Sequence, residues 1–151
     1  MNYIHIFNKY ILIEFIIYGL TVLGIVFFCI SDIPFESEPR VKNLPNLSKI
    51  KLYTRVGLVS FEIIVTIVVM LPLYKDKVLL SQNKYECRSG IACQEVYRSG
   101  LYGLFKSIIV ETDGEKFNYE VIYADKEIKK GDLVKVTFLP NSTYSIVEKI
   151  E

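Results

Sequence analysis

Two long apolar segments constrain this chain more than any other feature. Residues 10–30 read YILIEFIIYGLTVLGIVFFCI and residues 56–74 read VGLVSFEIIVTIVVMLPLY, and each segment carries a single charged residue, Glu14 or Glu62. An α-helix rises about 1.5 Å per residue, so each segment would extend roughly 28–32 Å, the thickness of the hydrocarbon core of a bilayer. The sequence therefore predicts two transmembrane helices.

A pair of buried core helices and a cleaved signal peptide both fit these segments less well. The residues that follow the second segment are too few to wrap two helices that are apolar on every side, which disfavours buried core helices. The first segment is long for the apolar part of a signal peptide, and Phe27, Phe28 and Ile30 lie where small cleavage-site residues belong. We therefore expect a multi-pass protein of the cell membrane, with the lipid bilayer as its first partner.

The remaining residues divide around these segments. Between them, Pro34, Pro39 and Pro45 interrupt regular structure, which predicts an extended connection. The expected organisation is an N-terminal tail (1–9), transmembrane helix 1 (10–30), a Pro-containing connecting loop (31–55), transmembrane helix 2 (56–74) and a small β-barrel domain (75–151).

Polar residues recur at helical spacing inside both apolar segments. Glu14, Tyr18 and Thr21 share one face of the first helix, and Glu62 and Thr66 share one face of the second. These faces could pack against each other, or against a partner helix or a second copy of the chain. Glu14 fits an interfacial position, and we expect the two glutamates not to meet. Glu62 is deeper, and three roles stay open for it: a structural or protonated carboxyl, a contact to a partner helix, or ion or proton conduction.

The basic residues leave the orientation nearly balanced. Five lie between the helices and five lie on the other side, namely Arg40, Lys42, Lys49, Lys51 and Arg55 against Lys9, Lys75, Lys77, Lys84 and Arg88. Lys75 and Lys77 directly follow the second helix, which favours a cytoplasmic C-terminal domain. Cys87 and Cys93 would then stay reduced. If the domain faces outward, the two cysteines could form a disulfide across a turn at residues 88–90, but a free pair of small apolar residues is the preferred interpretation.

From residue 75 onward the pattern alternates as it does in β-strands. Asp113-Gly114 between residues 107–112 and 115–123 predicts a tight hairpin, and residues 132–139 and 143–150 predict a second hairpin around Pro140-Asn141-Ser142. On the first strand of the second hairpin we expect Thr137 on the wetter side. Residues 91–98 read as a further strand, paired with 78–85. Five or six short strands favour a small antiparallel barrel of OB or SH3-like type, because closure removes exposed edges.

The end of the chain, EIKKGDLVKVTFLPNSTYSIVEKI, resembles the β domain of small bacterial two-span membrane proteins. Many of these belong to families of unknown function, and the barrel of NfeD-type membrane proteins has a similar Gly-Asp-x-Val-x-Val strand. The similarity covers roughly residues 107–150. It implies an OB-like or SH3-like fold, and no functional residue is carried over from it.

No arrangement of residues in the sequence indicates a catalytic role. His5 is the only His, so neither a Ser-His-Asp nor a Cys-His arrangement can form within the C-terminal domain. We predict no catalytic residue, no cofactor and no metal site. The formal net charge of +1 and the lack of a basic stripe argue against nucleic acid as a partner.

One apolar loop and three functional hypotheses complete these expectations. Leu101, Tyr102, Leu104 and Phe105 lie in a Gly-punctuated loop that either plugs the end of the barrel or contacts the bilayer or a partner. The preferred hypothesis is a non-catalytic integral membrane protein whose β domain mediates a protein interaction at the membrane surface, as an accessory or immunity-type protein. The alternative is a small oligomeric channel or transport accessory that uses Glu62. A membrane-linked hydrolase is a third, less favoured class.

Overall fold

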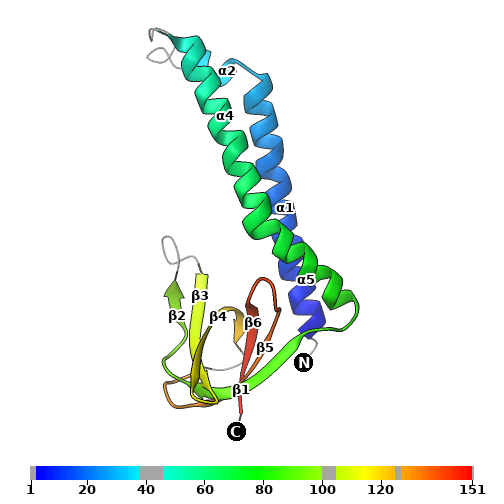
Figure 1. Cartoon of the computed structure of the whole chain (residues 1–151), viewed down its shortest axis with the longest axis vertical. Helices are drawn as coiled ribbons and strands as arrows, with labels where there is room; N and C mark the ends of the chain where they lie inside the picture. Colours follow the sequence, from blue (N-terminus) through cyan, green and yellow to red (C-terminus); the bar gives the residue numbers. More distant parts are fainter. Residues whose placement is uncertain (1–2, 38–45, 100–104, 125–126, 151) are drawn as a thin grey trace. The chain divides into compact units, whose positions relative to one another are not determined.

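The computed structural model describes residues 3–37, 46–99, 105–124 and 127–150, and the chain divides into two compact units (Figure 1). The helical unit contains residues 12–71, and the barrel unit contains residues 1–11 together with residues 72–151. Two of the helices cross the division, so each unit is described with its own part of them.

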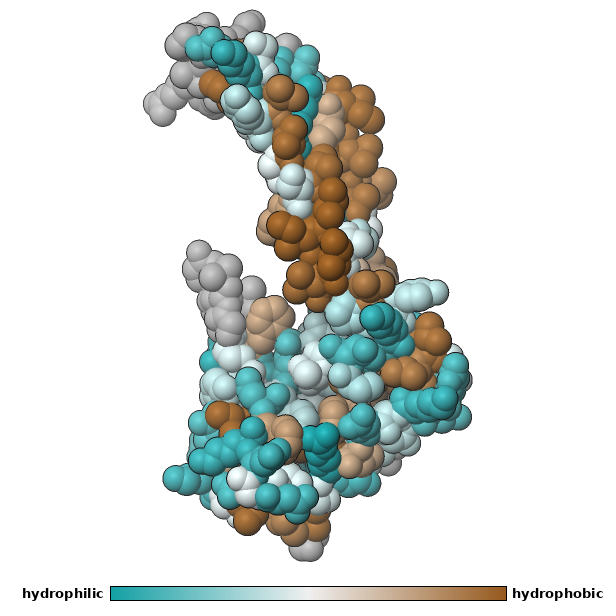
Figure 2. Space-filling model, in the orientation of Figure 1, coloured by the Kyte–Doolittle hydropathy of each residue, from teal (hydrophilic) through white to brown (hydrophobic). Residues whose placement is uncertain are grey.

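Long apolar helices form the helical unit. Their elements are α1 (Tyr3–Ile30), α2 (Ile33–Glu36), α4 (Leu47–Val65), the π-helical turn η1 (Thr66–Met70) and α5 (Leu71–Ser81). Two continuous helical stretches, 3–30 and 47–81, are long and apolar enough to cross a membrane. Only 6% and 11% of their most apolar windows are buried, and Figure 2 shows hydrophobic side chains along their visible surface. The expected apolar helices are present, with longer bounds than the sequence indicated.

The π-helical turn has a local cause in the sequence. Pro72 lacks an N–H group, and its ring would collide with a carbonyl four residues earlier in a regular α-helix. The chain widens over Thr66–Met70, directly before this proline, and then returns to α-helix at Leu71. A π-helical turn absorbs such a mismatch without ending the helix.

Six strands build the barrel unit. They are β1 (Glu86–Ala92), β2 (Tyr97–Ser99), β3 (Phe105–Thr112), β4 (Glu115–Ala124), β5 (Leu133–Phe138) and β6 (Tyr144–Lys149). Five of them close in the order β1-β3-β4-β6-β5, and β5 pairs again with β1. All pairs are antiparallel except β4 and β6, which are parallel. Strand β2 pairs with the first part of β3, beside the point where β1 joins it. The result is a mixed closed barrel.

Both predicted hairpins are confirmed. Asp113 and Gly114 have φ angles of 53° and 81°, as the two-residue turn between β3 and β4 requires. Val134, Val136 and Phe138 of β5 point into the core, together with Ile108, Val110, Tyr119, Val121 and Val147. Alternation of apolar and polar residues therefore placed the inner face of the barrel correctly.

The first residues of the chain do not form the expected tail. Helix α1 begins at Tyr3, and the Tyr3 hydroxyl donates a hydrogen bond of 2.6 Å to Glu148 on β6. The Tyr10 ring lies edge-on to Tyr144, with 5.0 Å between the ring centroids. Phe7, between these two residues in the sequence, is completely buried. Within the predicted tail, residues 3–9 are helical and pack on the outside of the barrel.

The start of the β domain also differs from the prediction. Residues 75–81 continue helix α5, so a strand at 78–85 is wrong, and β1 begins at Glu86. Leu73 and Leu80 are both buried and lie seven residues apart, on one face of a helix. The connection between the apolar segments is likewise not extended throughout, because α4 already begins at Leu47.

The predicted wet face of Thr137 and the predicted turn at residues 88–90 are wrong, whereas the preferred interpretation of Cys87 and Cys93 as free residues is confirmed. Thr137 was expected on a wet face but is completely buried, because the outer surface near the end of β5 is covered as well as the inner one. Residues 88–90 are not a turn but the middle of β1. Cys87 and Cys93 are therefore separated by an extended strand, roughly 20 Å at 3.3 Å per residue, which is too far for a disulfide. Both cysteines are free.

Candidate functional site

The polar faces that the sequence indicated on the two helices meet within the helical unit. The hydroxyls of Tyr18 and Thr66 are hydrogen-bonded at 2.6 Å, and the Thr21 hydroxyl donates to Glu62 Oε1 at 3.3 Å. Among the described residues, Glu14 takes no part in these hydrogen bonds. Four of the five predicted residues are thus brought together as a cross-helix polar cluster, and the two glutamates stay apart.

An apolar groove adjoins this polar cluster. It has a volume of about 710 Å³ and is lined by Thr21, Gly24, Ile25 and Phe28 of α1 and by Thr54, Leu58, Phe61, Glu62 and Val65 of α4. The Glu62 carboxylate is the one charged group in this lining. The Thr21 hydroxyl, which also donates to the Tyr18 carbonyl oxygen at 2.8 Å, is shared between that oxygen and the carboxylate and so gives the carboxylate a local polar contact.

A salt-bridge cluster closes one end of the helical unit. Asp32 Oδ1 lies 3.0 Å from Lys51 Nζ and 2.9 Å from an Arg55 terminal nitrogen. These cations, Lys51 first, lower the pKa of Asp32. The buried Phe35 ring packs edge-on against Phe28 at 5.0 Å, and both cations lie 5.8 Å from its centroid. Among the described residues of the connecting segment, Asp32, Lys51 and Arg55 thus pair with each other.

A buried carboxylate joins helix α5 to the β5–β6 turn inside the barrel unit. Asp76 is completely buried and accepts four hydrogen bonds. Two come from the backbone and side-chain nitrogens of Asn141, at 3.1 and 2.7 Å, and two come from the backbone nitrogen and hydroxyl of Ser142, at 2.7 and 2.6 Å. All four donors serve one carboxylate, so this contact fixes the helix on the turn.

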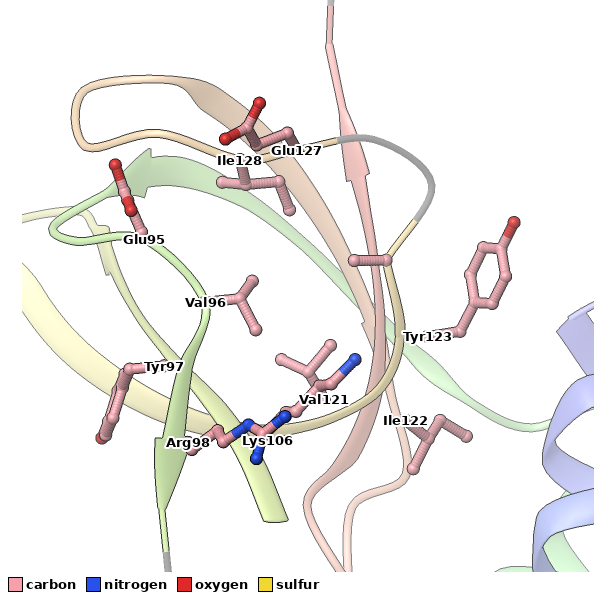
Figure 3. Close-up of a pocket in the computed structure, with 11 residues that line it drawn as sticks. Glu95, Val96, Tyr97, Arg98, Lys106, Val121, Ile122, Tyr123, Glu127 and Ile128 are labelled. Atoms are coloured by element: carbon pink, nitrogen blue, oxygen red, sulfur yellow. The ribbon is translucent and has the colours of Figure 1, made fainter. Parts of the chain in front are cut away.

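The mouth of the barrel contains a hollow of about 350 Å³ (Figure 3). Strand β2, the two residues before it and Lys106 of β3 form one wall, and the end of β4 with Glu127 and Ile128 forms the other. The floor contains Val96, Val121 and Ile128, which belong to the core cluster or pack against it. Its charged residues are Glu95, Arg98, Lys106 and Glu127. A volume of this size suits a small ligand or a few residues of a peptide.

The predicted apolar loop is described only at its end. Leu101, Tyr102 and Leu104 lie outside the described residues. Phe105 is the first residue of β3, pairs with Ser99 of β2 and is 40% exposed. Phe105 thus lies partly at the surface, and both interpretations of the whole loop stay predictions.

Sequence reasoning missed the hollow and the Asp76 contact. Arg98 and Lys106 become neighbours only through the register of β2 with β3, and no turn signature in the sequence fixed that register. Asp76 sits within a run of charged residues that reads as solvent-exposed. Within the ranges that the structure describes, no three His, Cys, Asp or Glu side chains gather where a metal ion could be held.

Comparison with models of known protein families, with curated proteins and with solved structures finds no match for this chain. The resemblance to NfeD-type barrels therefore rests on the strand pattern alone.

Proposed function

We propose that the chain is a two-span membrane protein whose barrel binds another protein at the membrane surface without catalysing a reaction. The observation that carries the membrane part is the exposure of apolar side chains around both helices, such as Leu20, Leu23, Phe61 and Val68. Such surfaces are costly in water and suited to lipid. A soluble core helix would be mostly buried, and the second helix is too far from the N-terminus to be a signal peptide.

We infer that the barrel belongs to the OB class rather than the SH3-like class. The strands β1, β3 and β4 form an antiparallel meander, the next strand, β5, crosses over to pair with β1, and β6 then lies between β5 and β4, parallel to β4. This is the Greek-key connectivity of five-stranded OB barrels. The class is host to many activities, so it supports a binding module without selecting a partner.

The hollow at the barrel mouth supports a binding role for the barrel. It combines apolar floor residues with charged residues on its rim, the composition of a recognition site. Its charges are mixed in sign, so nucleic acid is not the partner that we propose.

The channel alternative receives less support from the polar cluster. The hydroxyls of Tyr18, Thr21 and Thr66 are engaged with one another or with Glu62. A carboxylate held in this way within a helix pair fits a structural role, so we propose that Glu62 stabilises the packing of the helices.

The membrane part is tested by alkaline extraction and flotation of the full chain. We expect it to remain with the lipid at high pH, because apolar helices rather than charges hold it there. Recovery as a monomer in the aqueous fraction would refute two membrane spans.

The binding part is tested by photo-crosslinking in native membranes. A photoreactive phenylalanine replaces Tyr97, which lines the hollow, and in a matched control it replaces Leu133, which is exposed on β5. We expect a discrete protein adduct from position 97 and none from position 133. Absence of an adduct from both positions under several growth conditions would contradict a partner at the barrel.

A further inference from the structure

Two cations lie opposite each other on one wall of the barrel-mouth hollow. The register of β2 with β3 makes Arg98 and Lys106 direct cross-strand partners, and Figure 3 places both beside Val121. Like charges in this relationship destabilise a strand pair. Within the part of the chain that the structure describes, neither side chain forms an ion pair that would offset this repulsion.

Two carboxylates lie at the other end of the same hollow. Glu95 precedes β2 and Glu127 follows β4, and Figure 3 shows them together on the side away from Arg98 and Lys106. Both side chains are exposed, and among the described residues neither forms an ion pair. The hollow is therefore positive at one end and negative at the other.

The floor between the two charged ends is apolar and firmly held. Val121 and Ile128 are 5% and 2% exposed and belong to the barrel core, and Val96 packs against that core. A floor that is part of the core keeps its shape when a ligand binds, which lowers the entropy lost on binding.

We propose that this hollow binds a short peptide segment of the protein partner, in which an apolar residue lies between an acidic and a basic residue. The acidic side chain contacts Arg98 and Lys106, the apolar side chain rests on Val96, Val121 and Ile128, and the basic side chain contacts Glu95 and Glu127. This assignment rests on the proposed function. It adds the chemistry of the peptide segment that is recognised. Because the two ends of the hollow carry opposite charges, they select both the composition of the peptide and the direction in which it binds.

A phosphate group or an anionic lipid surface would satisfy only half of this site. Either would be attracted by Arg98 and Lys106, but Glu95 and Glu127 would repel a continuous negative surface. The mixture of charges thus favours a peptide with both signs.

The test uses the full chain in detergent micelles and nine-residue peptides with one of three centres: Glu-Leu-Lys, Glu-Leu-Glu or Lys-Leu-Lys. Fluorescence anisotropy measures binding to the unmodified chain and to two double variants, R98E/K106E and E95K/E127K. All four residues are exposed, so the variants should fold, and hydrogen exchange of residues 133–149 verifies this. A fourth arm adds inorganic phosphate or vesicles rich in anionic lipid.

We expect the unmodified chain to bind the Glu-Leu-Lys peptide at least tenfold more tightly than the two like-charged peptides. R98E/K106E should lose this preference, and its affinity for the Lys-Leu-Lys peptide should rise at least tenfold. E95K/E127K should instead bind the Glu-Leu-Glu peptide more tightly. Equal binding of all three peptides, or a preference unchanged in R98E/K106E, would overturn the assignment. So would binding of phosphate or anionic vesicles with none of the Glu-Leu-Lys peptide. If position 97 still captures a protein in membranes while the peptides show no preference, the proposed function stands and this inference fails.

Discussion

Ser142 donates two hydrogen bonds to Oδ2 of Asp76, one from its backbone nitrogen at 2.7 Å and one from its hydroxyl at 2.6 Å. The two residues are 66 positions apart in the sequence. Asn141 supplies two more donors to Oδ1 of the same carboxylate. A completely buried carboxylate is tolerated because these donors replace the water that it loses. This contact ties the helical segment before β1 to the turn between the last two strands.

Asp76→Asn should destabilise the barrel unit by about 3 kcal/mol, because an amide presents N–H groups to N–H donors and leaves buried groups without partners. Urea unfolding of the full chain in micelles, followed by hydrogen exchange of residues 133–149, measures the loss. Asp113→Asn is the matched control, since Asn suits the positive φ of 53° at that exposed turn. A loss below about 0.5 kcal/mol for Asp76→Asn would contradict a stabilising role.

Asp76 also marks the limit of what the sequence could predict. The hairpins at 113–114 and 140–142 were predictable because turn chemistry and alternation are local. The continuation of the helix over residues 75–81 was not predictable, because charged residues mask the buried spacing of Leu73, Asp76 and Leu80, which has meaning only against the barrel. Thr137 was placed wrongly for the same reason, since alternation assumes that one face of a strand meets water.

Of the candidate sites, likewise, one was predictable from local sequence spacing and another was not. The polar faces on the helices were predictable from spacing, and Tyr18, Thr21, Glu62 and Thr66 do meet. The hollow was not predictable, because the pairing of Arg98 with Lys106 depends on a strand register that no turn signature in the sequence fixes.

Gly90→Ala should destabilise the barrel by about 1–3 kcal/mol. A Cβ atom at Gly90 would lie 2.8 Å from Val110 Cγ1 and even closer to the Glu111 carbonyl oxygen, so β1 would have to move away from β3. That pairing closes the barrel. Urea unfolding measures the effect, and the exposed neighbour Ser89→Ala serves as the control. Equal stability of the two variants would show that closure does not depend on this close approach.

The barrel should lose an ion-pair contribution from Asp132 in acid. Its carboxylate lies 2.8 Å from Lys149 Nζ and accepts a bond of 2.8 Å from the Lys129 backbone nitrogen, and these two partners, Lys149 first, lower the pKa of Asp132 below 3.8. Because the pKa is lowered in the folded state, the contact stabilises the fold fully at pH values above the ordinary pKa of an Asp. This stabilisation is lost as the pH falls through the lowered pKa. The Asp132→Asn variant should therefore have a lower melting temperature than the unmodified chain at pH 7. The gap between the two melting temperatures should narrow as pH falls below about 4.

Melting temperatures of both chains between pH 7 and pH 3 measure the gap. Asp113→Asn, whose turn carboxylate forms no ion pair among the described residues, should show no pH-dependent gap. A gap for Asp132→Asn that stays constant over this range would contradict the assignment.

Glu62→Gln should leave ion flux unchanged. If Glu62 stabilises helix packing through Thr21, then neither the unmodified chain nor the variant should conduct in proteoliposomes. Flux of protons and of monovalent cations measures this outcome, and Thr21→Val removes the same hydrogen bond as a matched variant. Flux through the unmodified chain that Glu62→Gln abolishes would favour the channel alternative over the structural role.

Cys87 allows the proposed sidedness to be tested directly. It is exposed on β1, so it should react readily once Cys29 and Cys93 have been replaced by Ser. With the barrel in the cytoplasm, a membrane-impermeant maleimide should label it only after the cells are permeabilised. The control is Ser48→Cys in a chain otherwise free of cysteine, because Ser48 is exposed at the start of α4, in the segment between the two apolar stretches. Two spans place this position on the opposite side, so it should be labelled in intact cells. The reverse pattern would place the barrel outside, whereas labelling of both positions from the same side would contradict two membrane spans.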